Sequence, residues 1–316
     1  MPLPLPNHVI NLVVTCTNRK ATAAPASLQA RTLTGKSIAS RAKVWTDRLS
    51  ERTDGTPAGA LYKGDHWSVI QSIAPSRGAL KVNVWIASAG YGLISPRSRV
   101  VAYAATLAGR HPDTVACSSD DRRLWWTSLT HSPARVLPLE PRSLRQLASK
   151  YSSSPLIIAA SPEYIDAMAD DILLAVAKLD TPNLLSVLCR KGGAPIDIEE
   201  FVVALNASFA FELGGALTSL NARVVRWLVS FGTAELTRST VKRYVGQLAE
   251  RCPARAVPKR TRVNDAEIIL LIQREQRTQH RSRSALLRVL REKGYAVEQS
   301  RFGKIYNEIT EVSSAS

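Results

Sequence analysis

Four short apolar segments, each followed by a polar turn, place the strongest constraint on the fold of this 316-residue chain. They are HVINLVVT (8–15), VNVWIAS (82–88), PLIIAA (155–160) and NLLSVLC (183–189). Continuous apolar runs of this length, rich in Val and Ile, are typical of strands that are buried on both faces of a parallel sheet. The sequence therefore predicts an α/β fold, with a mostly parallel sheet and helices on both of its faces.

The turns that follow these strands are expected to form one site. The carboxyl ends of parallel strands meet at the same edge of a sheet, and ligands of open α/β proteins bind at that edge. The residues that we expect there are Thr17, Asn18, Arg19, Lys20, Ser88, Gly90, Tyr91, Ser161 and Arg190.

Positive charge is concentrated in the two flanks of the chain. The formal net charge is +16, from 42 Lys and Arg against 26 Asp and Glu. Residues 1–152 carry +12, residues 153–219 carry −6 and residues 220–316 carry +10. Such a regional excess indicates a polyanionic partner, because basic side chains that neutralise phosphates gain from counterion release. The alternative is a solvated basic surface without a partner.

Composition and periodicity divide the chain into four parts. Residues 1–198 are predicted to form the α/β domain and 264–312 a basic three-helix module. Between them we expect a helical extension (199–252), with helices near 199–211, 221–230 and 237–250, and a Pro- and Arg-rich linker (253–263). Three short helices with a glycine turn at Gly294 are typical of helix-turn-helix modules, although other three-helix bundles share this pattern.

The basic side chains of this module favour contact with DNA. The candidates are Arg281, Arg283, Arg288, Arg301 and Lys304. Lys and Arg that neutralise backbone phosphates supply most of the affinity for DNA, irrespective of its sequence. Double-stranded DNA is therefore the predicted partner.

Neither a metal or other cofactor nor a membrane is expected to bind. The four cysteines (Cys16, Cys117, Cys189 and Cys252) are scattered without CxxC spacing, which argues against a zinc site and a disulfide scaffold. The first apolar run is only of strand length and no basic segment precedes it, so neither a signal peptide nor a membrane span is predicted. We therefore expect a cytoplasmic protein.

Three motifs of the N-terminal domain carry a resemblance to a known group. They are VVTCTNRK (13–20), LYKGDHW (61–67) and WIASAGYGLI (85–94), the last followed by Tyr103. Over about residues 8–193 the chain resembles the YaaA-like domains, relatives of a domain found in archaeal tRNA-guanine transglycosylases. The resemblance implies a fold similar to that of uracil-DNA glycosylase. It also implies an anti-phage activity, the removal of modified bases from DNA.

The chain departs from uracil-DNA glycosylases at their catalytic turn. Those enzymes carry a Gly-Gln-Asp-Pro-Tyr run there, whereas this chain has Cys16 to Lys20 without a carboxylate. Their second motif is matched only faintly, by Ser161 and Pro162. Uracil is therefore not the expected substrate, and any catalytic carboxylate must come from elsewhere.

Candidate roles follow from the chemistry of base excision, which needs a group to hold water and donors around the departing base. Asn18 either positions that water or caps a following helix. For the carboxylate we favour Asp113, with Asp65 second. Tyr91 and Tyr103 are candidates for stacking on a flipped base, although such aromatics are more often part of the core. His66, beside Trp67, is interpreted as a packed or hydrogen-bonded side chain.

Two functions of different classes remain open. The first is a DNA glycosylase that flips out and excises a modified base and leaves an abasic site. The second is a DNA-binding protein without enzymatic activity that works in stress response or nucleoid organisation. An RNA-modification enzyme is a third alternative.

Overall fold

The computed structural model describes residues 8–52, 54–73, 76–77, 80–131, 140–233, 235–252, 260–278 and 281–314. The chain divides into two compact units, residues 1–254 and residues 255–316. Residue 198 is therefore not a boundary between units. Most of the expected linker, residues 253–259, lies outside the described part of the chain.

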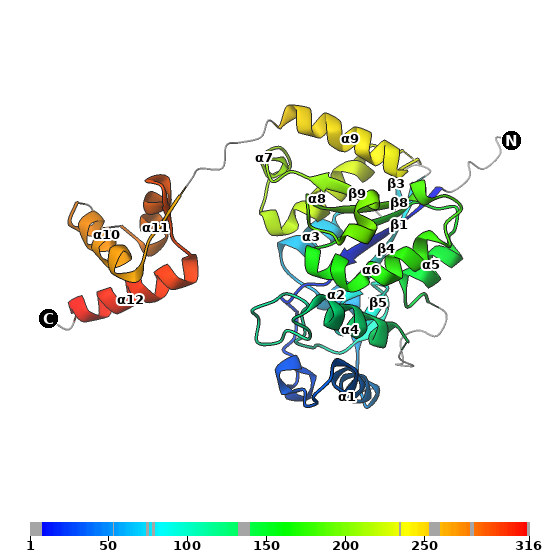
Figure 1. The fold of residues 1–316 in the computed structure, drawn as a ribbon, viewed down its shortest axis with the longest axis horizontal. Helices are drawn as coiled ribbons and strands as arrows, with labels where there is room; N and C mark the ends of the chain where they lie inside the picture. The colour runs from blue at the N-terminus through cyan, green and yellow to red at the C-terminus, as the bar shows by residue number, and fades with distance from the viewer. Residues whose placement is uncertain are drawn as a thin grey trace. The chain divides into compact units, whose positions relative to one another are not determined.

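A mostly parallel sheet forms the centre of the larger unit (Figure 1). Its strand order is β3-β4-β1-β7-β8-β9, and β5 pairs with β4. The neighbours from β4 to β9 are all parallel, whereas β3 and β5 run antiparallel to β4. The strands are β1 (His8–Thr15), β3 (Ser76–Arg77), β4 (Leu80–Ser88), β5 (Gly92–Ile94), β7 (Leu156–Ala159), β8 (Leu185–Arg190) and β9 (Val202–Leu205). All four predicted strands are confirmed.

The helices of this unit fall into two packing groups. Helix α6 packs against α4 and α5, and α1 packs against α4 (Figure 1), whereas α3 packs against α8. The connections from β1 to β4 and from β7 to β8 run in opposite directions across the sheet. The right-handed rule for such crossovers predicts α3 and α6 on opposite faces. The helices are α1 (Ile38–Ser50), α2 (Ala58–Leu61), α3 (Asp65–Gln71), α4 (Ser119–His131), α5 (Leu144–Lys150), α6 (Pro162–Val176), α7 (Phe209–Leu213), α8 (Leu220–Ser230) and α9 (Arg238–Arg251).

Short elements complete the larger unit. An antiparallel pair, β2 (Thr56–Pro57) with β6 (Arg99–Val100), lies outside the main sheet. The 3-10 helices are η1 (Ala26–Leu28), η2 (Ala30–Thr32), η3 (Pro182–Leu184), η4 (Ile196–Phe201) and η5 (Leu217–Ser219).

The expectation of a purely helical extension over 199–252 is wrong at one point. Residues 202–205 form β9, which pairs with β8 and adds a fifth parallel strand to the sheet. A four-residue apolar run suits a strand and a turn of helix equally well, and here the pairing with β8 decides between them. The helices predicted at 221–230 and 237–250 are confirmed as α8 and α9.

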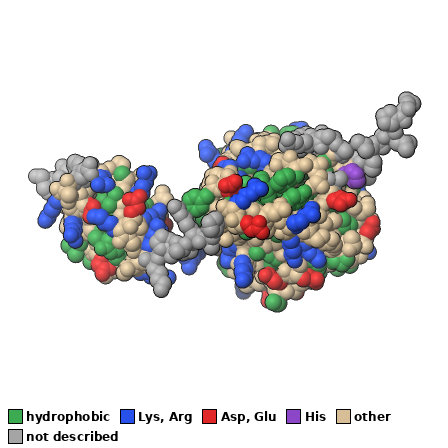
Figure 2. Space-filling view, turned by 90° about the horizontal axis from the view of Figure 1, so that it is seen from above, with side chains coloured by type: hydrophobic (Ala, Val, Ile, Leu, Met, Phe, Trp, Pro, Cys, Tyr) green, Lys and Arg blue, Asp and Glu red, His purple; other side chains and the backbone are tan. Residues whose placement is uncertain are grey.

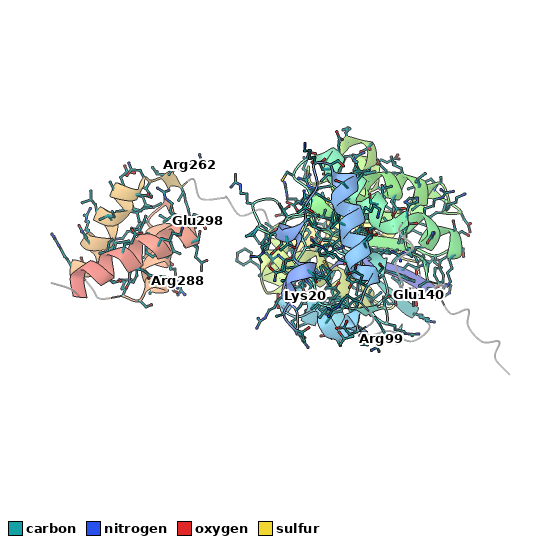
Figure 3. The ribbon with its side chains drawn as sticks, turned by 90° about the horizontal axis from the view of Figure 1, so that it is seen from below. Lys20, Arg99, Glu140, Arg262, Arg288 and Glu298 are labelled. Carbon is teal, nitrogen blue, oxygen red and sulfur yellow. The ribbon has the colours of Figure 1, made fainter. Side chains whose placement is uncertain are left out.

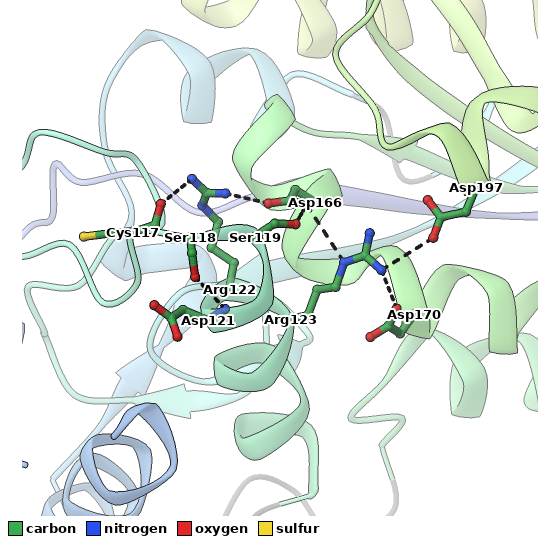
Figure 4. Close-up of polar contacts among 9 residues, drawn as sticks. All are labelled: Cys117, Ser118, Ser119, Asp121, Arg122, Arg123, Asp166, Asp170 and Asp197. Carbon is green, nitrogen blue, oxygen red and sulfur yellow. Dashed lines mark hydrogen bonds and ion pairs between the residues drawn. The ribbon is translucent and has the colours of Figure 1, made fainter. Parts of the chain in front are cut away.

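An ion-pair network holds α6 against α4 and η4 (Figure 4). Arg122 on α4 pairs with Asp166 on α6 at 2.6 Å. Arg123 pairs with Asp170 on α6 at 2.8 Å and with Asp197 on η4 at 3.5 Å. Part of the acidic charge of residues 153–219 is thus neutralised by arginines from the basic first half of the chain.

The smaller unit has the three predicted helices, α10 (Asp265–Thr278), α11 (Arg283–Glu292) and α12 (Gln299–Ser314). They enclose a core that includes Ile268, Leu286 and Phe302. A short parallel pair, β10 (Thr261–Arg262) with β11 (Tyr295–Ala296), closes one side. Gly294 follows α11 with a φ of +87°, a conformation that glycine adopts at little cost, as predicted for a helix C-terminus.

Among the described residues, no helix combines the length and the apolar character that crossing a bilayer requires.

Candidate functional site

A cavity of about 260 Å³ lies at the carboxyl edge of the parallel sheet. Thr15 ends β1, Ala160 follows β7, Arg190 ends β8 and Leu205 ends β9, and all four line it. The chain leaves β1 toward β4 on one side and returns to β7 on the other, so the cavity lies at the topological switch point, where open α/β folds bind ligands. The predicted convergence of strand-end turns is thus present for three of the four predicted strands.

His66, the second residue of α3, contributes an imidazole to this cavity. Both ring nitrogens are buried, and neither has a hydrogen-bond partner of good geometry among the described residues. Burial lowers the pKa of His66 below 6.5, and the Thr15 backbone and the charge of Asp65 oppose this lowering only in part. The ring is therefore neutral at pH 7, with one nitrogen able to donate and the other able to accept.

Asn221 and Ser161 bring further polar groups to the cavity wall. The Asn221 side-chain amide donates to the Ala160 carbonyl at 2.6 Å, which fixes the orientation of the Asn221 carbonyl oxygen. Ser161 precedes α6, but its hydroxyl donates to Glu163 at 2.8 Å instead of capping the helix. The positive end of the α6 dipole therefore lies beside the cavity without a side-chain cap.

The rest of the wall is apolar or basic. Ala159, Pro162, Leu205 and Leu217 line the cavity, and the Leu217 side chain is 61% exposed. Arg190 is exposed and supplies the basic side chain of this wall. Of the residues predicted for the site, the structure brings Ser161 and Arg190 into one cavity.

Four other predicted site residues are buried in the core. Ser88 is fully buried, and its hydroxyl shares a hydrogen bond of 2.7 Å with the Tyr103 hydroxyl. Tyr103 is 1% exposed, and Tyr91 bonds to the Val101 backbone through its hydroxyl. A Cβ on Gly90 would lie 2.7 Å from the Tyr103 ring, so glycine permits this packing. Their burial argues against contact with a base, and a role for these residues in binding stays a prediction.

The turn after β1 lies outside the cavity. Asn18 and Arg19 are exposed, and Asn18 caps no helix, because the next helical turn begins at Ala26. Lys20 (Figure 3) donates to the Thr17 carbonyl at 3.2 Å and lies 4.1 Å from the centre of the Tyr103 ring. Burial lowers the pKa of Lys20, although the charges of Cys16 and Asp113 oppose this. A role of this turn in backbone contact stays a prediction.

Both candidate carboxylates are held by arginines. Asp113 is 2% exposed and accepts from the Arg31 side chain at 2.9 and 2.7 Å, and from its backbone amide at 3.2 Å. Asp65, at the start of α3, accepts from the Ser219 hydroxyl at 2.5 Å and from Arg223 at 2.7 Å. The Asp65 contacts join α3 to α8. Neither carboxylate lines the cavity, so the geometry argues against either one as the base that activates water.

We expect Asp113→Asn to lower the free energy of unfolding by about 2–3 kcal/mol at pH 7, because it weakens a buried carboxylate–guanidinium pair that is open to solvent on the arginine side. Burial raises the pKa of Asp113, but the hydrogen bonds and charge of Arg31 outweigh it and hold the pKa below 3.8. This stabilisation is present above pH 3.8 and is lost as the pH falls through the lower, folded-state pKa. Urea unfolding at pH 7 and at pH below 3.8 measures both effects.

Asp47→Asn is the matched control, since Asp47 forms an exposed ion pair with Lys43. Its expected effect is below about 0.5 kcal/mol. Unchanged stability of Asp113→Asn, with loss of a catalytic activity, would restore Asp113 as a catalytic candidate.

The basic side chains predicted for DNA contact in the smaller unit differ in whether they form ion pairs within the protein. Arg301 is committed to the fold, because it pairs with Asp265 at 2.5 Å and donates to the Val263 carbonyl at 3.1 Å. Arg283, Arg288 and Lys304 are exposed and form no ion pair with any described residue. The prediction of backbone contact therefore stays with these three and with Arg281, which is half-buried.

Sequence reasoning missed two cavity residues. The neighbouring Trp67 indicated that His66 is a packed or hydrogen-bonded side chain. Asn221 lies in a segment that was predicted to be a helical extension. No local signal distinguishes either one, because each reaches the cavity through tertiary packing.

Across the described residues, no group of three His, Cys, Asp or Glu side chains is arranged to hold a metal ion. Comparison with known protein families, with curated proteins and with solved structures finds no match to this chain.

Proposed function

We propose that this chain is a DNA glycosylase that takes one base out of the duplex into the cavity at the carboxyl edge of the sheet and excises it. The observation that carries the proposal is the pairing of a small cavity with a buried imidazole whose ring nitrogens have no hydrogen bond of good geometry to a described residue. A volume of about 260 Å³ is below the range of drug-sized pockets and suits a single base. The apolar wall suits the faces of a base, and the polar groups suit its edge.

The chemistry needs three groups, and this wall can supply them. Hydrolysis breaks the bond between C1′ and the base nitrogen and forms a bond between C1′ and a water oxygen. The departing base takes the bonding electron pair and then the proton that the water releases. Neutral His66 can donate a hydrogen bond to that base as its charge develops. The oriented Asn221 carbonyl can hold the water, and Arg190 with the α6 N-terminus can hold a flanking phosphate.

A DNA-binding protein without enzymatic activity is the second candidate. The observation that favours it is the absence of Asp and Glu from the described residues that line the cavity. A glycosylase without a carboxylate must rely on amide and imidazole groups to hold its water, which is a weaker arrangement.

Formation of abasic sites separates the two candidates. The full-length protein is incubated with phage DNAs that carry different base modifications, and alkali-labile breaks are then counted. We expect breaks in at least one modified DNA and none in the unmodified control. Tight binding to every DNA without such breaks would contradict the enzymatic proposal and leave the binding protein. A preference for structured RNA over duplex DNA in a gel shift would contradict both.

A further inference from the structure

A polar groove of about 600 Å³ lies on the smaller unit, between α11 and α12. Arg283 and Ser284 at the start of α11 form one wall. Gln299, Lys304 and Asn307 of α12 form the other. Leu287 and Phe302, which belong to the core, form its floor. The groove is thus rich in donors and acceptors and rests on a packed base.

The wall formed by α12 is one continuous face of that helix. Gln299, Ser300, Lys304 and Asn307 are exposed, whereas Phe302 and Ile305 are buried in the core. With its side chains an α-helix is about 10–12 Å in diameter. The major groove of B-DNA is about 12 Å wide and admits an α-helix. Helix α12 therefore fits the major groove in cross-section.

The side chains of this face are of the kinds that read base edges. Gln and Asn can bond bidentately to adenine, and Lys and Arg bond to guanine, all through the major groove. Arg283 and Lys304 also give the groove positive charge, and Figure 2 shows further Lys and Arg side chains on the surface of this unit, interspersed with acidic ones. This charge complements a polyanion.

One acidic residue, Glu298, also lines the groove (Figure 3). Its carboxylate accepts from the backbone amides of Ser300 and Arg301 and from the Ser300 hydroxyl. The Ser300 side chain and these amides lower the pKa of Glu298 to about 2. The carboxylate thus caps α12, and its charge is compensated by the positive end of the helix.

We infer that α12 lies in the major groove of duplex DNA and reads its sequence, with Gln299 and Asn307 toward base edges and with Arg283 and Lys304 toward the backbone. This inference rests on the DNA-binding part of the proposed function and adds sequence specificity to it. The protein is then directed to a defined site before any base enters the cavity of the larger unit. Double-stranded RNA does not fit this surface, because its major groove is too narrow for side chains to read.

A substitution at Gly303 can fill the polar groove between α11 and α12 without disturbing the fold. It lies in the middle of α12, and a Cβ there would meet only Arg283, at 3.8 Å. Gly303→Glu adds a long, negatively charged side chain to the groove, and glutamate is a better helix former than glycine. Gly246→Glu is the matched control, because Gly246 lies in α9 with open space around its Cβ position. Both variants change the net charge equally.

The experiment selects binding sites for the full-length protein from unmodified duplexes with a randomised central stretch. We expect the pool to converge on a short motif, which Gly303→Glu binds about tenfold or more weakly and Gly246→Glu binds as the native protein does. We expect Asn307→Ala to relax the preference at one base pair, with roughly tenfold less discrimination there. Melting temperatures of the glutamate variants should equal or exceed that of the native protein.

Three results would overturn the inference: a pool without a motif, equal weakening by both glutamate variants, or equal affinity for duplex RNA. Because the duplexes are unmodified and no excision is measured, failure of the glycosylase proposal leaves this experiment unaffected. Conversely, if abasic sites form in modified DNA but the selected duplexes share no motif, only the inference that α12 recognises a DNA sequence is contradicted.

Discussion

Substitution of His66 by leucine is expected to slow base release by about 10²- to 10⁴-fold, the range that a positioned acid–base or hydrogen-bonding side chain contributes. Binding of duplex DNA should stay within about twofold, since the imidazole contacts only the base in the cavity. Stability should not fall. Two buried ring nitrogens without a hydrogen bond of good geometry to a described residue are costly, so an apolar side chain of similar size is expected to maintain or raise the denaturant midpoint.

The pH dependence of the native protein tests the same group. Burial holds the pKa of His66 below 6.5, so the neutral ring predominates at pH 7. Base release should therefore be constant from pH 7 downward until the pH approaches that lowered pKa, and should rise as the ring becomes protonated, because an imidazolium donates more strongly to the departing base. His66→Gln, which can donate and accept but does not titrate near neutrality, should keep part of the activity and lose this acid limb.

His131→Ala is the control for loss of a histidine as such. His131 ends α4 and does not line the cavity. If His66→Leu and His131→Ala release bases at the same rate, His66 has no part in the reaction. If His66→Leu unfolds at lower denaturant than the native protein, the ring is structural, and its effect on activity is indirect.

The sheet could be predicted from sequence because its strands are buried on both faces, which leaves an uninterrupted apolar run at each one. β1 and β7 are such strands, and both were recognisable without tertiary information. β9 was not, because its four residues follow a short 3-10 helix and owe their conformation to β8. The edge of the sheet that holds the cavity followed from the same reasoning, since strand direction fixes where the turns lie.

The side chains of the site could be predicted only in part. Ser161 comes shortly after β7 and Arg190 ends β8, so the predicted positions of these strands were enough to place both residues at the cavity. Asp113 looked available as a base because its partner, Arg31, lies 82 residues earlier in the chain. Tyr103 remained a candidate for base stacking for the same reason, since Lys20 and Tyr62, which contact it, come from distant parts of the sequence. Partners that meet only in the fold leave no pattern in the sequence.

The second large effect is expected on removal of residues 255–316. This segment carries 13 Lys and Arg against 7 Asp and Glu, so its loss should lower the affinity for unmodified duplex DNA by about 10²-fold near physiological salt. The plot of log affinity against log salt should also become shallower. Each phosphate contact contributes a slope of about −0.9, so loss of three contacts should change the slope by roughly 2–3.

A full-length variant distinguishes phosphate contact from folding within that segment. Arg283→Gln, Arg288→Gln and Lys304→Gln together should reproduce most of the change in slope, since these three side chains are exposed and form no ion pair with a described residue. Arg301→Gln removes the same kind of charge but breaks the pair with Asp265, so it should lower the melting temperature and leave the slope nearly unchanged. An unaltered slope in the triple variant would mean that the duplex meets other parts of the chain, and the backbone contacts would then have to come from the exposed turn after β1 and from Arg190.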